Sequence, residues 1–209
     1  MSRYEVSEMF HSIQGEGLYS GTAMTFVRFA GCSVGKKICH ACDTDFELKY
    51  PWRGGGDLSP ADIAAFIGND LHVCATGGEP LDQDLQPLFD ALTSQQLLHI
   101  ETSGTRDFRA LPFRDKVWIT VSPKPGYIHD ILAQANEVKI IVPGLGAGGG
   151  WPSLEVALAV RALGVITYIQ PRNERNTINQ ENLAYCQDIV RQHPQLRLSV
   201  QLHKLLRVR

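Results

Sequence analysis

The strongest constraint on the fold is an alternation of short apolar, β-branched runs with amphipathic segments, which begins near Thr25 and continues along the chain. Runs of this length are typical of buried strands, and the segments between them have the spacing of crossover helices. Strands joined by such crossovers lie parallel to one another. We expect strands at residues 25–29, 72–75, 98–101, 117–121, 138–142, 166–170 and 197–201.

Four helices are expected between these strands. Ser59 and Pro60 supply an N-cap and a first-turn proline for one of them. The other three are indicated by apolar residues at helical spacing. These residues are Leu85, Leu88, Phe89 and Leu92, then Leu154, Ala157 and Leu158, then Leu183, Cys186, Ile189 and Val190.

Polar motifs follow five of the expected strands. The motifs are TGGEP at 76–80, ETSG at 101–104, SPK at 122–124, QPRN at 170–173 and QLHK at 201–204. A single polar strand end is an ordinary turn. Five of them favour a ligand-lined edge, because the carboxyl ends of parallel strands meet where such folds place their active sites. About seven strands and four helices predict an incomplete α/β barrel of parallel strands with crossover helices. An open doubly wound sheet is the alternative.

Length and charge narrow the function classes. The chain has 209 residues, and we expect residues 1–209 to form a single domain. Its formal net charge of -2 gives no electrostatic reason to expect nucleic acid or a membrane surface as partner. No apolar run reaches the roughly 20 residues of a membrane span, and the first ten residues do not have the pattern of a signal peptide. We therefore expect a cytoplasmic protein with a small-molecule ligand.

Three of the five cysteines are clustered directly after the first expected strand, at Cys32, Cys39 and Cys42. Thiolates are soft ligands that suit iron-sulfur clusters or zinc. A closed structural zinc site needs four ligands, and His40, Cys74 or a water could supply the fourth. Three cysteines on a 4Fe-4S cluster would instead leave one iron open to bind a second group. Cys74 and Cys186 lie in apolar patterns, and we expect both in the core.

Arg28 lies between Val27 and Phe29 on the first expected strand. Alternation along a strand predicts that its side chain points away from theirs, toward a cavity if they face the helices. A guanidinium group in a cavity could bind a carboxylate with two hydrogen bonds. The alternative is an exposed surface arginine.

A glycine-rich run at 144–149 fits the G-x-G-x-x-G pattern of dinucleotide-binding loops. The following strand has no acidic residue to bind a ribose hydroxyl group, and Pro143 and Pro152 flank the run. We interpret it as a flexible loop.

The ordered set of motifs resembles the 7-carboxy-7-deazaguanine synthases of the radical S-adenosylmethionine superfamily. The resemblance rests on the cysteine loop with Asp43-Thr44-Asp45 after it, on the five strand-end motifs, and on EMFHSIQGEG at 8–17. It extends from about Glu8 to Lys204. One departure is the spacing between Cys32 and Cys39, which is six residues here and three in the usual superfamily loop.

The resemblance implies a 4Fe-4S cluster on Cys32, Cys39 and Cys42, with S-adenosylmethionine on its open iron, and Mg²⁺ at Thr44. Without the resemblance, Thr44 could equally be a turn or capping residue. The resemblance assigns S-adenosylmethionine binding to Ala41, Cys42, Asp43, Gly78, Ser122, Pro123, Lys124, Gln170, Pro171, Arg172 and Asn173. It assigns substrate binding to Ile13, Gln14, Gly15, Arg28, Thr76, Gln201, His203 and Arg209. It assigns a catalytic role to Glu101 as well as to the three cysteines.

The reaction implied is the radical ring contraction of 6-carboxy-5,6,7,8-tetrahydropterin to 7-carboxy-7-deazaguanine with loss of ammonia, a step of queuosine and 7-deazapurine biosynthesis. An external electron donor such as flavodoxin and a homodimeric assembly are implied in the same way. Two alternatives remain at this point, namely an activase of glycyl-radical enzymes and a non-radical zinc-binding protein.

Overall fold

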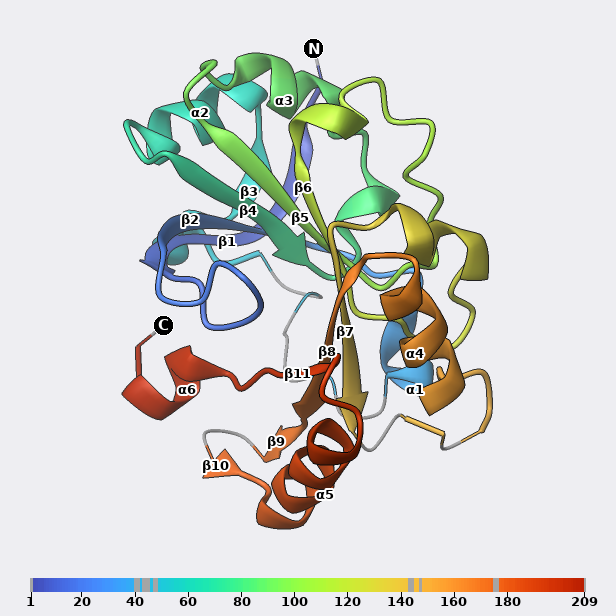
Figure 1. Ribbon diagram of the computed structural model, residues 1–209. Coiled ribbons are helices and arrows are strands. Elements are labelled where there is room, and N and C mark those ends of the chain that lie inside the picture. Colours follow the sequence, from blue (N-terminus) through green and yellow to red (C-terminus); the bar gives the residue numbers. More distant parts are fainter. Residues whose placement is uncertain are drawn as a thin grey trace. The chain divides into compact units, whose positions relative to one another are not determined.

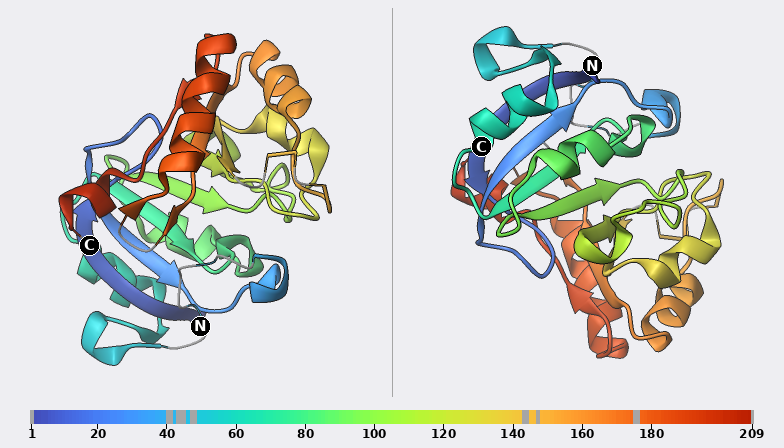
Figure 2. Two further views of the ribbon diagram at one scale, coloured as in Figure 1. Left: turned by 90° about the horizontal axis from the view of Figure 1, so that it is seen from below. Right: turned by 90° about the horizontal axis from the view of Figure 1, so that it is seen from above.

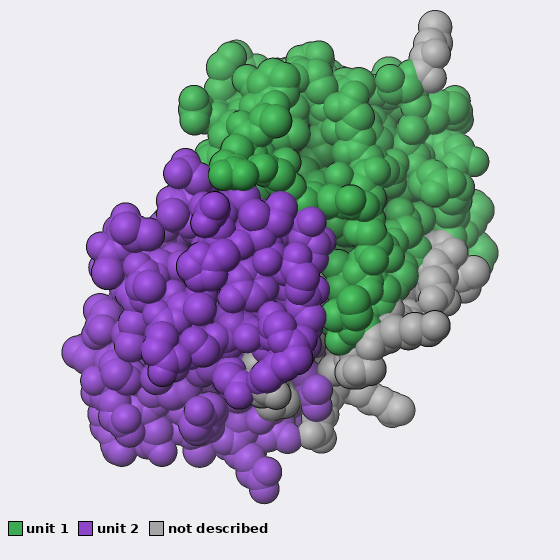
Figure 3. All heavy atoms as spheres, turned by 90° about the vertical axis from the view of Figure 1, so that its right-hand side faces the viewer, with its two compact units in different colours: residues 1–12, 23–102, 106–119 green, residues 13–22, 103–105, 120–209 purple. Residues whose placement is uncertain are grey.

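The computed structural model describes residues 2–39, 42, 46, 49–142, 145–146, 148–174 and 177–208, with the backbone alone at Lys36, Lys37 and Glu174. The described residues form two compact units whose segments alternate along the sequence (Figure 3). Unit 1 comprises residues 1–12, 23–102 and 106–119, and unit 2 comprises residues 13–22, 103–105 and 120–209. The single domain expected over 1–209 therefore stays a prediction.

In unit 1 the strand order is β3-β1-β2-β4-β5. The strands β2, β4 and β5 are parallel, and β3 pairs with β1 in the antiparallel sense. Their bounds are β1 Tyr4–Ile13, β2 Ala23–Phe29, β3 Gly56–Leu58, β4 His72–Gly77 and β5 Leu97–Thr102.

The helices of unit 1 are short. Their bounds are α1 Gly35–Ile38, η1 Pro51–Arg53, α2 Pro60–Ile67, η2 Pro80–Asp82, α3 Gln86–Ala91 and η3 Arg114–Lys116. The start of α2 is the one expected from the sequence, because Ser59 caps it in a reciprocal pair with Asp62 and Pro60 occupies its first turn. The helices α2 and α3 pack against each other (Figure 1).

Unit 2 has the strand order β6-β7-β8-β11, all parallel, and the boundary between the units falls within β6. A separate antiparallel pair is formed by β9 and β10. The bounds are β6 Trp118–Val121, β7 Glu137–Val142, β8 Ile166–Pro171, β9 Asn173–Glu174, β10 Thr177–Ile178 and β11 Arg197–Leu198. The helices are η4 His129–Gln134, α4 Leu154–Ala162, α5 Gln180–Gln192 and α6 Leu202–Leu206.

Each unit has its own apolar core. In unit 1, Val27 and Phe29 of β2 are fully buried. In unit 2, Val138 and Ile140 of β7 are fully buried, and α4 and α5 both contact β8 (Figure 2). Burying a side chain of this size stabilises the fold by about 1.5–3 kcal/mol, so these alternating apolar positions fix the register of the strands.

The predicted fold class is confirmed. All seven expected strands and all four expected helices are present, and the strands end on open edges at β3 and β11 instead of closing into an eightfold barrel. The described residues of the glycine-rich run form turns and a bend. Within the described residues no helix combines the length and apolar character needed to cross a bilayer.

One expected strand is shorter than predicted and one strand was missed. The strand expected at 197–201 ends at Leu198. The Ser199 N–H still donates to the Ile169 carbonyl of β8 (3.0 Å), but the chain then turns into α6, whose Leu202 N–H donates to the Gly15 carbonyl (2.9 Å). The N-terminal strand β1 was not predicted at all.

Candidate functional site

The three clustered cysteines lie in one loop of unit 1, directly after β2. All three are partly exposed, and none of them forms a disulfide. The residues between the first two cysteines include α1, and the loop folds back on itself because the Cys39 N–H donates to the Gly35 carbonyl (3.1 Å) and the Cys42 N–H donates to the Cys39 carbonyl (3.0 Å). The extra residues between Cys32 and Cys39 are thus accommodated as a helical turn.

The three thiols are soft ligands that suit a cluster or a single ion. Ligands of one zinc ion must converge on one atom at about 2.3 Å. Among the residues that the structure describes, no three His, Cys, Asp or Glu side chains converge in this way. Cysteines on a four-iron cluster bind separate irons and therefore stand farther apart. Three cysteines in one loop could also hold that larger group.

The Cys32 thiol lies beside two carboxylates. Burial raises its pKa, and the charges of Glu79 and Asp82 add to this rise, whereas the Gly35 and Val34 N–H groups oppose it. Coordination to a metal would deprotonate the thiol outright. Asp82 also fixes the loop, because its Oδ2 accepts a hydrogen bond from the Ser33 N–H at 2.7 Å.

The stretch after β4 packs directly on the cysteine loop. A β-carbon built on Gly78 would stand 1.6 Å from the Gly31 carbonyl oxygen and 3.0 Å from Cys32 Cβ. Only glycine permits this approach. The next residue, Glu79, is 1% exposed, and its Oε1 accepts a 2.7 Å hydrogen bond from the Thr102 hydroxyl group. A buried carboxylate of this kind holds the strand ends together.

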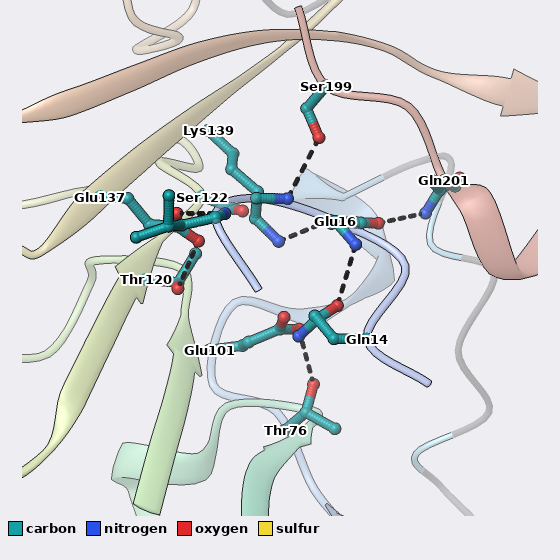
Figure 4. A network of polar contacts seen from close by, with 12 residues as sticks. Gln14, Glu16, Thr76, Glu101, Thr120, Ser122, Glu137, Lys139, Ser199 and Gln201 are labelled. Atoms are coloured by element: carbon teal, nitrogen blue, oxygen red, sulfur yellow. Dashed lines mark hydrogen bonds and ion pairs between the residues drawn. The ribbon is translucent and has the colours of Figure 1, made fainter. Parts of the chain in front are cut away.

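Three of the predicted site residues form a row across neighbouring strands of unit 1. Arg28 and Thr76 are register partners on β2 and β4, and the Thr76 hydroxyl group donates to Glu101 Oε2 on β5 at 3.3 Å (Figure 4). Arg28 points away from the buried Val27 and Phe29, as expected.

Arg28 also has a carboxylate partner that the sequence did not indicate. Its Nε donates to Glu8 Oε1 at 3.0 Å, and the guanidinium group lies over the Phe10 ring. Arg53 approaches the other oxygen of Glu8 at 3.3 Å. The plane of the Arg28 guanidinium is therefore fixed by its neighbours.

In unit 2, the segment 13–17 packs on the C-terminal helix. A β-carbon on Gly15 would stand 1.9 Å from His203 Nδ1, and the Leu202 N–H donates to the Gly15 carbonyl at 2.9 Å. The neighbouring Gln14 side chain accepts a hydrogen bond from the Glu16 N–H at 3.0 Å. The structure thus brings together Gln14, Gly15 and His203, three of the predicted substrate residues, while Ile13 is the last residue of β1.

The same segment covers a polar face of the unit 2 strands. Glu16 Oε2 pairs with Lys139 Nζ at 2.5 Å, and Glu16 Oε1 accepts from Gln201 Nε2 at 2.6 Å (Figure 4). Burial raises the pKa of Glu16, but the Lys139 charge and hydrogen bonds from Lys139, Gln201 and Gln170 outweigh it and lower the pKa to about 2. Glu16 is therefore ionised at neutral pH.

A second buried carboxylate, Glu137, lies on the same strand as Lys139. It accepts hydrogen bonds from the Thr120 hydroxyl group at 2.9 Å and from the Leu18 N–H at 2.9 Å. The Gly17 N–H donates to the Ser199 hydroxyl group at 3.4 Å. These contacts hold the segment 13–22 on the strands.

The predicted cofactor residues of unit 2 follow β6 and β8. The Ser122-Pro123-Lys124 turn is held by a hydrogen bond from the Lys124 N–H to the Ser103 carbonyl, at 3.1 Å. The Lys124 ammonium group donates to the Ser122 carbonyl at 3.3 Å and lies 5.8 Å from the centre of the Trp151 ring. Lys124 is therefore positioned by its own turn and by an aromatic face.

The QPRN motif contains buried polar atoms without hydrogen-bond partners. These atoms are Gln170 Oε1, Asn173 Nδ2 and Asn173 Oδ1. Pro171 is buried beside them, and the N–H of Arg172, the residue after β8, donates to the Val142 carbonyl at 2.7 Å. A buried polar atom without a partner costs about 1–3 kcal/mol, so this strand end is suited to receiving a polar ligand.

Four predicted site residues lie outside the described residues. They are Ala41 and Asp43 of the cofactor set, Thr44 of the Mg²⁺ site, and Arg209 of the substrate set.

Comparison with known proteins gives the family. No family model matches the chain. The chain is 36% identical to a 7-carboxy-7-deazaguanine synthase from Synechocystis sp. over 99% of its length and 94% of the relative. The chain belongs to the 7-carboxy-7-deazaguanine synthase family. Synthases from Burkholderia multivorans and Bradyrhizobium diazoefficiens are 33% and 36% identical to it, over 98% and 99% of the chain and 99% of each relative.

A solved structure supports the same assignment. The crystal structure of QueE from Escherichia coli superposes with a TM-score of 0.72 at 28% identity, covering 96% of this chain and 95% of that one. This member of the 7-carboxy-7-deazaguanine synthase family therefore shares the incomplete-barrel fold along nearly its whole length.

Several residues of this family member were not singled out from the sequence. Glu16, Glu137 and Lys139 form the polar face of unit 2, and Glu8 pairs with Arg28. Glu8 and Glu16 both lie in the EMFHSIQGEG run, which is one of the motifs that carry the resemblance, so this run could have drawn attention to them. Lys139 gave no such signal, because it lies inside an apolar strand.

Proposed function

We propose that this chain converts 6-carboxy-5,6,7,8-tetrahydropterin to 7-carboxy-7-deazaguanine, by removal of a hydrogen atom from carbon 6, ring contraction and loss of ammonia. The observation that carries the proposal is the single loop that brings Cys32, Cys39 and Cys42 together outside any disulfide, in a chain that matches synthases of this name over nearly its full length.

The cysteines would hold a 4Fe-4S cluster, with one iron open for S-adenosylmethionine. When bound, these groups supply the one-electron chemistry that starts the reaction. The protein's own contribution at this place is support for the loop. The Gly78 backbone packs on Gly31, and Asp82 holds Ser33, so the position of Cys32 is set by unit 1 itself.

The row on β2, β4 and β5 would bind the substrate. Arg28, whose guanidinium plane is fixed by Glu8, would receive the substrate carboxylate. Thr76 and Glu101, which are hydrogen-bonded to each other, would contact the ring. We also propose Mg²⁺ at Thr44, where an oxygen ligand suits a hard cation that could position the carboxylate.

Unit 2 would bind S-adenosylmethionine and the remaining edge of the substrate. Ser122, Pro123, Lys124 and the stretch 170–173 would hold the cofactor. The unpartnered atoms of Gln170 and Asn173 support this role, because a bound ligand would satisfy them. Gln14, Gly15 and His203 already pack together and would contact the pterin with Gln201.

We propose a homodimer, an external electron donor such as flavodoxin, and a cytoplasmic location where the thiols stay reduced. The terminal residue Arg209 remains a candidate for a substrate contact through its carboxylate.

The proposal is tested by product formation. The protein is reconstituted anaerobically with iron and sulfide, reduced, and incubated with S-adenosylmethionine, Mg²⁺ and 6-carboxy-5,6,7,8-tetrahydropterin, and the products are analysed by mass spectrometry. We expect 7-carboxy-7-deazaguanine and 5'-deoxyadenosine. Reconstituted protein that yields no deazaguanine would reject the substrate.

A pair of cysteine variants serves as the matched control. Cys39→Ser should abolish product formation, because it removes one of three cluster ligands. Cys186→Ala changes a buried cysteine of α5, far along the chain from the loop, and should retain activity. Equal activity in the two variants would contradict the role of the loop.

A further inference from the structure

The Glu16 carboxylate joins two glutamines of unit 2. Its Oε1 accepts a hydrogen bond from Gln201 Nε2 at 2.6 Å, and Gln170 also hydrogen-bonds to it through its side chain. Gln170 is the second-last residue of β8, and Gln201 immediately precedes α6. One acidic side chain from the segment 13–22 thus meets amides from two other parts of the chain, and Figure 4 shows its contact with Gln201.

An ionised carboxylate can only accept hydrogen bonds. Each glutamine must therefore present its NH₂ group to Glu16, which leaves the carbonyl oxygen as the end that a ligand can reach. The orientation of an amide is otherwise ambiguous, because its two ends are nearly the same size. Contact with Glu16 removes this ambiguity at Gln170 and Gln201 together.

Lys139 keeps Glu16 in the ionised form. Its ammonium group pairs with Glu16 Oε2, and its side chain is 3% exposed. Without that charge, burial would favour the protonated acid. A protonated carboxyl group can donate to the carbonyl oxygen of an amide or accept from its NH₂ group, so it would not select one orientation. The ion pair therefore maintains the acceptor character on which both amide orientations depend.

The carbonyl end of the Gln170 amide has no hydrogen-bond partner. Gln170 is 3% exposed, and its Oε1 has no hydrogen-bond partner in this structure. The nearby Asn173 side chain has none either. A carbonyl oxygen buried in this way requires a donor to offset its desolvation, so it is suited to an N–H group of a ligand.

We propose that Glu16, braced by Lys139, is a positioning residue that sets Gln170 and Gln201 as hydrogen-bond acceptors for N–H donors of two different bound heterocycles. The inference rests on the proposed function, in which Gln170 faces the cofactor and Gln201 the substrate. Both ligands carry suitable donors, namely the amino group of adenine and the amino and ring N–H groups of a pterin. A single carboxylate thereby fixes the orientation of one amide group in each of the two binding subsites.

Equilibrium binding with two unreactive probes tests the proposal. Reconstituted protein is titrated separately with S-adenosylhomocysteine and with 6-carboxypterin. Glu16→Gln should weaken both probes about tenfold or more, because its own NH₂ group can donate to either glutamine and rotate the amides. Gln170→Met should weaken only S-adenosylhomocysteine, and Gln201→Met only 6-carboxypterin.

Glu155→Gln is the matched control. Glu155 is an exposed acid in the first turn of α4 in the same unit, and its carboxylate hydrogen-bonds to Ser153, not to the glutamines. This variant should bind both probes as the wild type does. Wild-type affinity for both probes in Glu16→Gln, or weakening of only one, would overturn the shared role of Glu16.

If Glu16→Gln does not fold, hydrogen exchange of the glutamine side-chain NH₂ groups in the wild-type protein tests the amide orientations directly. In wild-type protein labelled with ¹⁵N-glutamine, the side-chain NH₂ signals of Gln170 and Gln201, assigned with the two methionine variants, should exchange slowly with solvent. Fast exchange at either residue would reject the proposal. Wild-type protein that binds neither probe would instead reject the proposed function, and the exchange measurement would still decide the amide orientations.

Discussion

The backbone of Gly78 lies against the backbone of Gly31, so closely that a β-carbon on Gly78 would stand 1.6 Å from the Gly31 carbonyl oxygen. Gly31 immediately precedes Cys32, and the Glu79 N–H donates to the same carbonyl at 3.2 Å. The strand end after β4 therefore fixes the first cysteine of the loop. The GGEP motif has a structural role in addition to any contact with a ligand.

Gly78→Ala should displace the cysteine loop, because backbone atoms cannot move aside as a flexible side chain does. We expect a clear loss of iron and sulfide bound after anaerobic reconstitution, measured by chemical analysis. Gly164→Ala is the control, since Gly164 has a positive φ but open space around it. That variant should bind iron normally, and equal losses in both variants would show that the close contact is not responsible.

Arg28→Lys should raise the KM for 6-carboxy-5,6,7,8-tetrahydropterin about tenfold or more, because a lysine cannot form two parallel hydrogen bonds with a carboxylate. The matched control is Arg53→Lys. Arg53 pairs with the same Glu8 carboxylate but lies in η1, outside the row on the strands. Steady-state kinetics should show an unchanged KM for this control; an equal rise in both variants would point to Glu8 and not to substrate binding.

His99 should make the stability of the chain depend on pH. Burial, together with the charge of His72, lowers the pKa of His99 from 6.5 to about 3. The unfolded chain therefore binds a proton below about pH 6.5 that the folded chain does not. The contribution of neutral His99 to the free energy of unfolding should be fully present above that pH. The free energy of unfolding should then fall by up to about 1.4 kcal/mol per pH unit on acidification toward pH 3.

Chemical denaturation of the metal-free chain between pH 7.5 and 5 checks this prediction. His99→Gln removes the titrating group and should flatten the pH dependence, whereas the exposed His129 can be changed to Gln without altering it. A slope that persists in His99→Gln would assign the effect to other groups. Glu16 is separable from His99, because its pKa of about 2 confines its contribution to the range below its ordinary value of 4.5.

The alternation of apolar runs was sufficient to predict the seven parallel strands and their helices, since burial of positions such as Val27 and Ile140 decides their structure. The strand β1 was missed because Glu5 and Glu8 interrupt its apolar pattern. These charges are neutralised by partners distant in sequence, Lys49 for Glu5 and Arg28 for Glu8. Single-sequence patterns contain no information about such partners.

The same reason limits prediction of the site. The cysteine loop and the strand-end motifs are local in sequence, so they could be recognised directly. Glu16 and Lys139 are 123 residues apart in the sequence, and the apolar residues around Lys139 indicate a buried strand, where a charged site residue is not expected. Likewise the strand expected to reach Gln201 stops at Leu198, and the Gln201 side chain contacts Glu16, which is 185 residues away in the sequence.

The central claim is that three cysteines hold a four-iron cluster with one iron open to S-adenosylmethionine. It is tested most directly by iron, zinc and sulfide analysis of the anaerobically reconstituted protein, with electron paramagnetic resonance of the reduced form before and after addition of S-adenosylmethionine. We expect about four irons and four sulfides per chain, and a reduced-cluster spectrum that changes when the cofactor is added. Zinc without sulfide, or a cluster spectrum unaffected by the cofactor, would contradict the account.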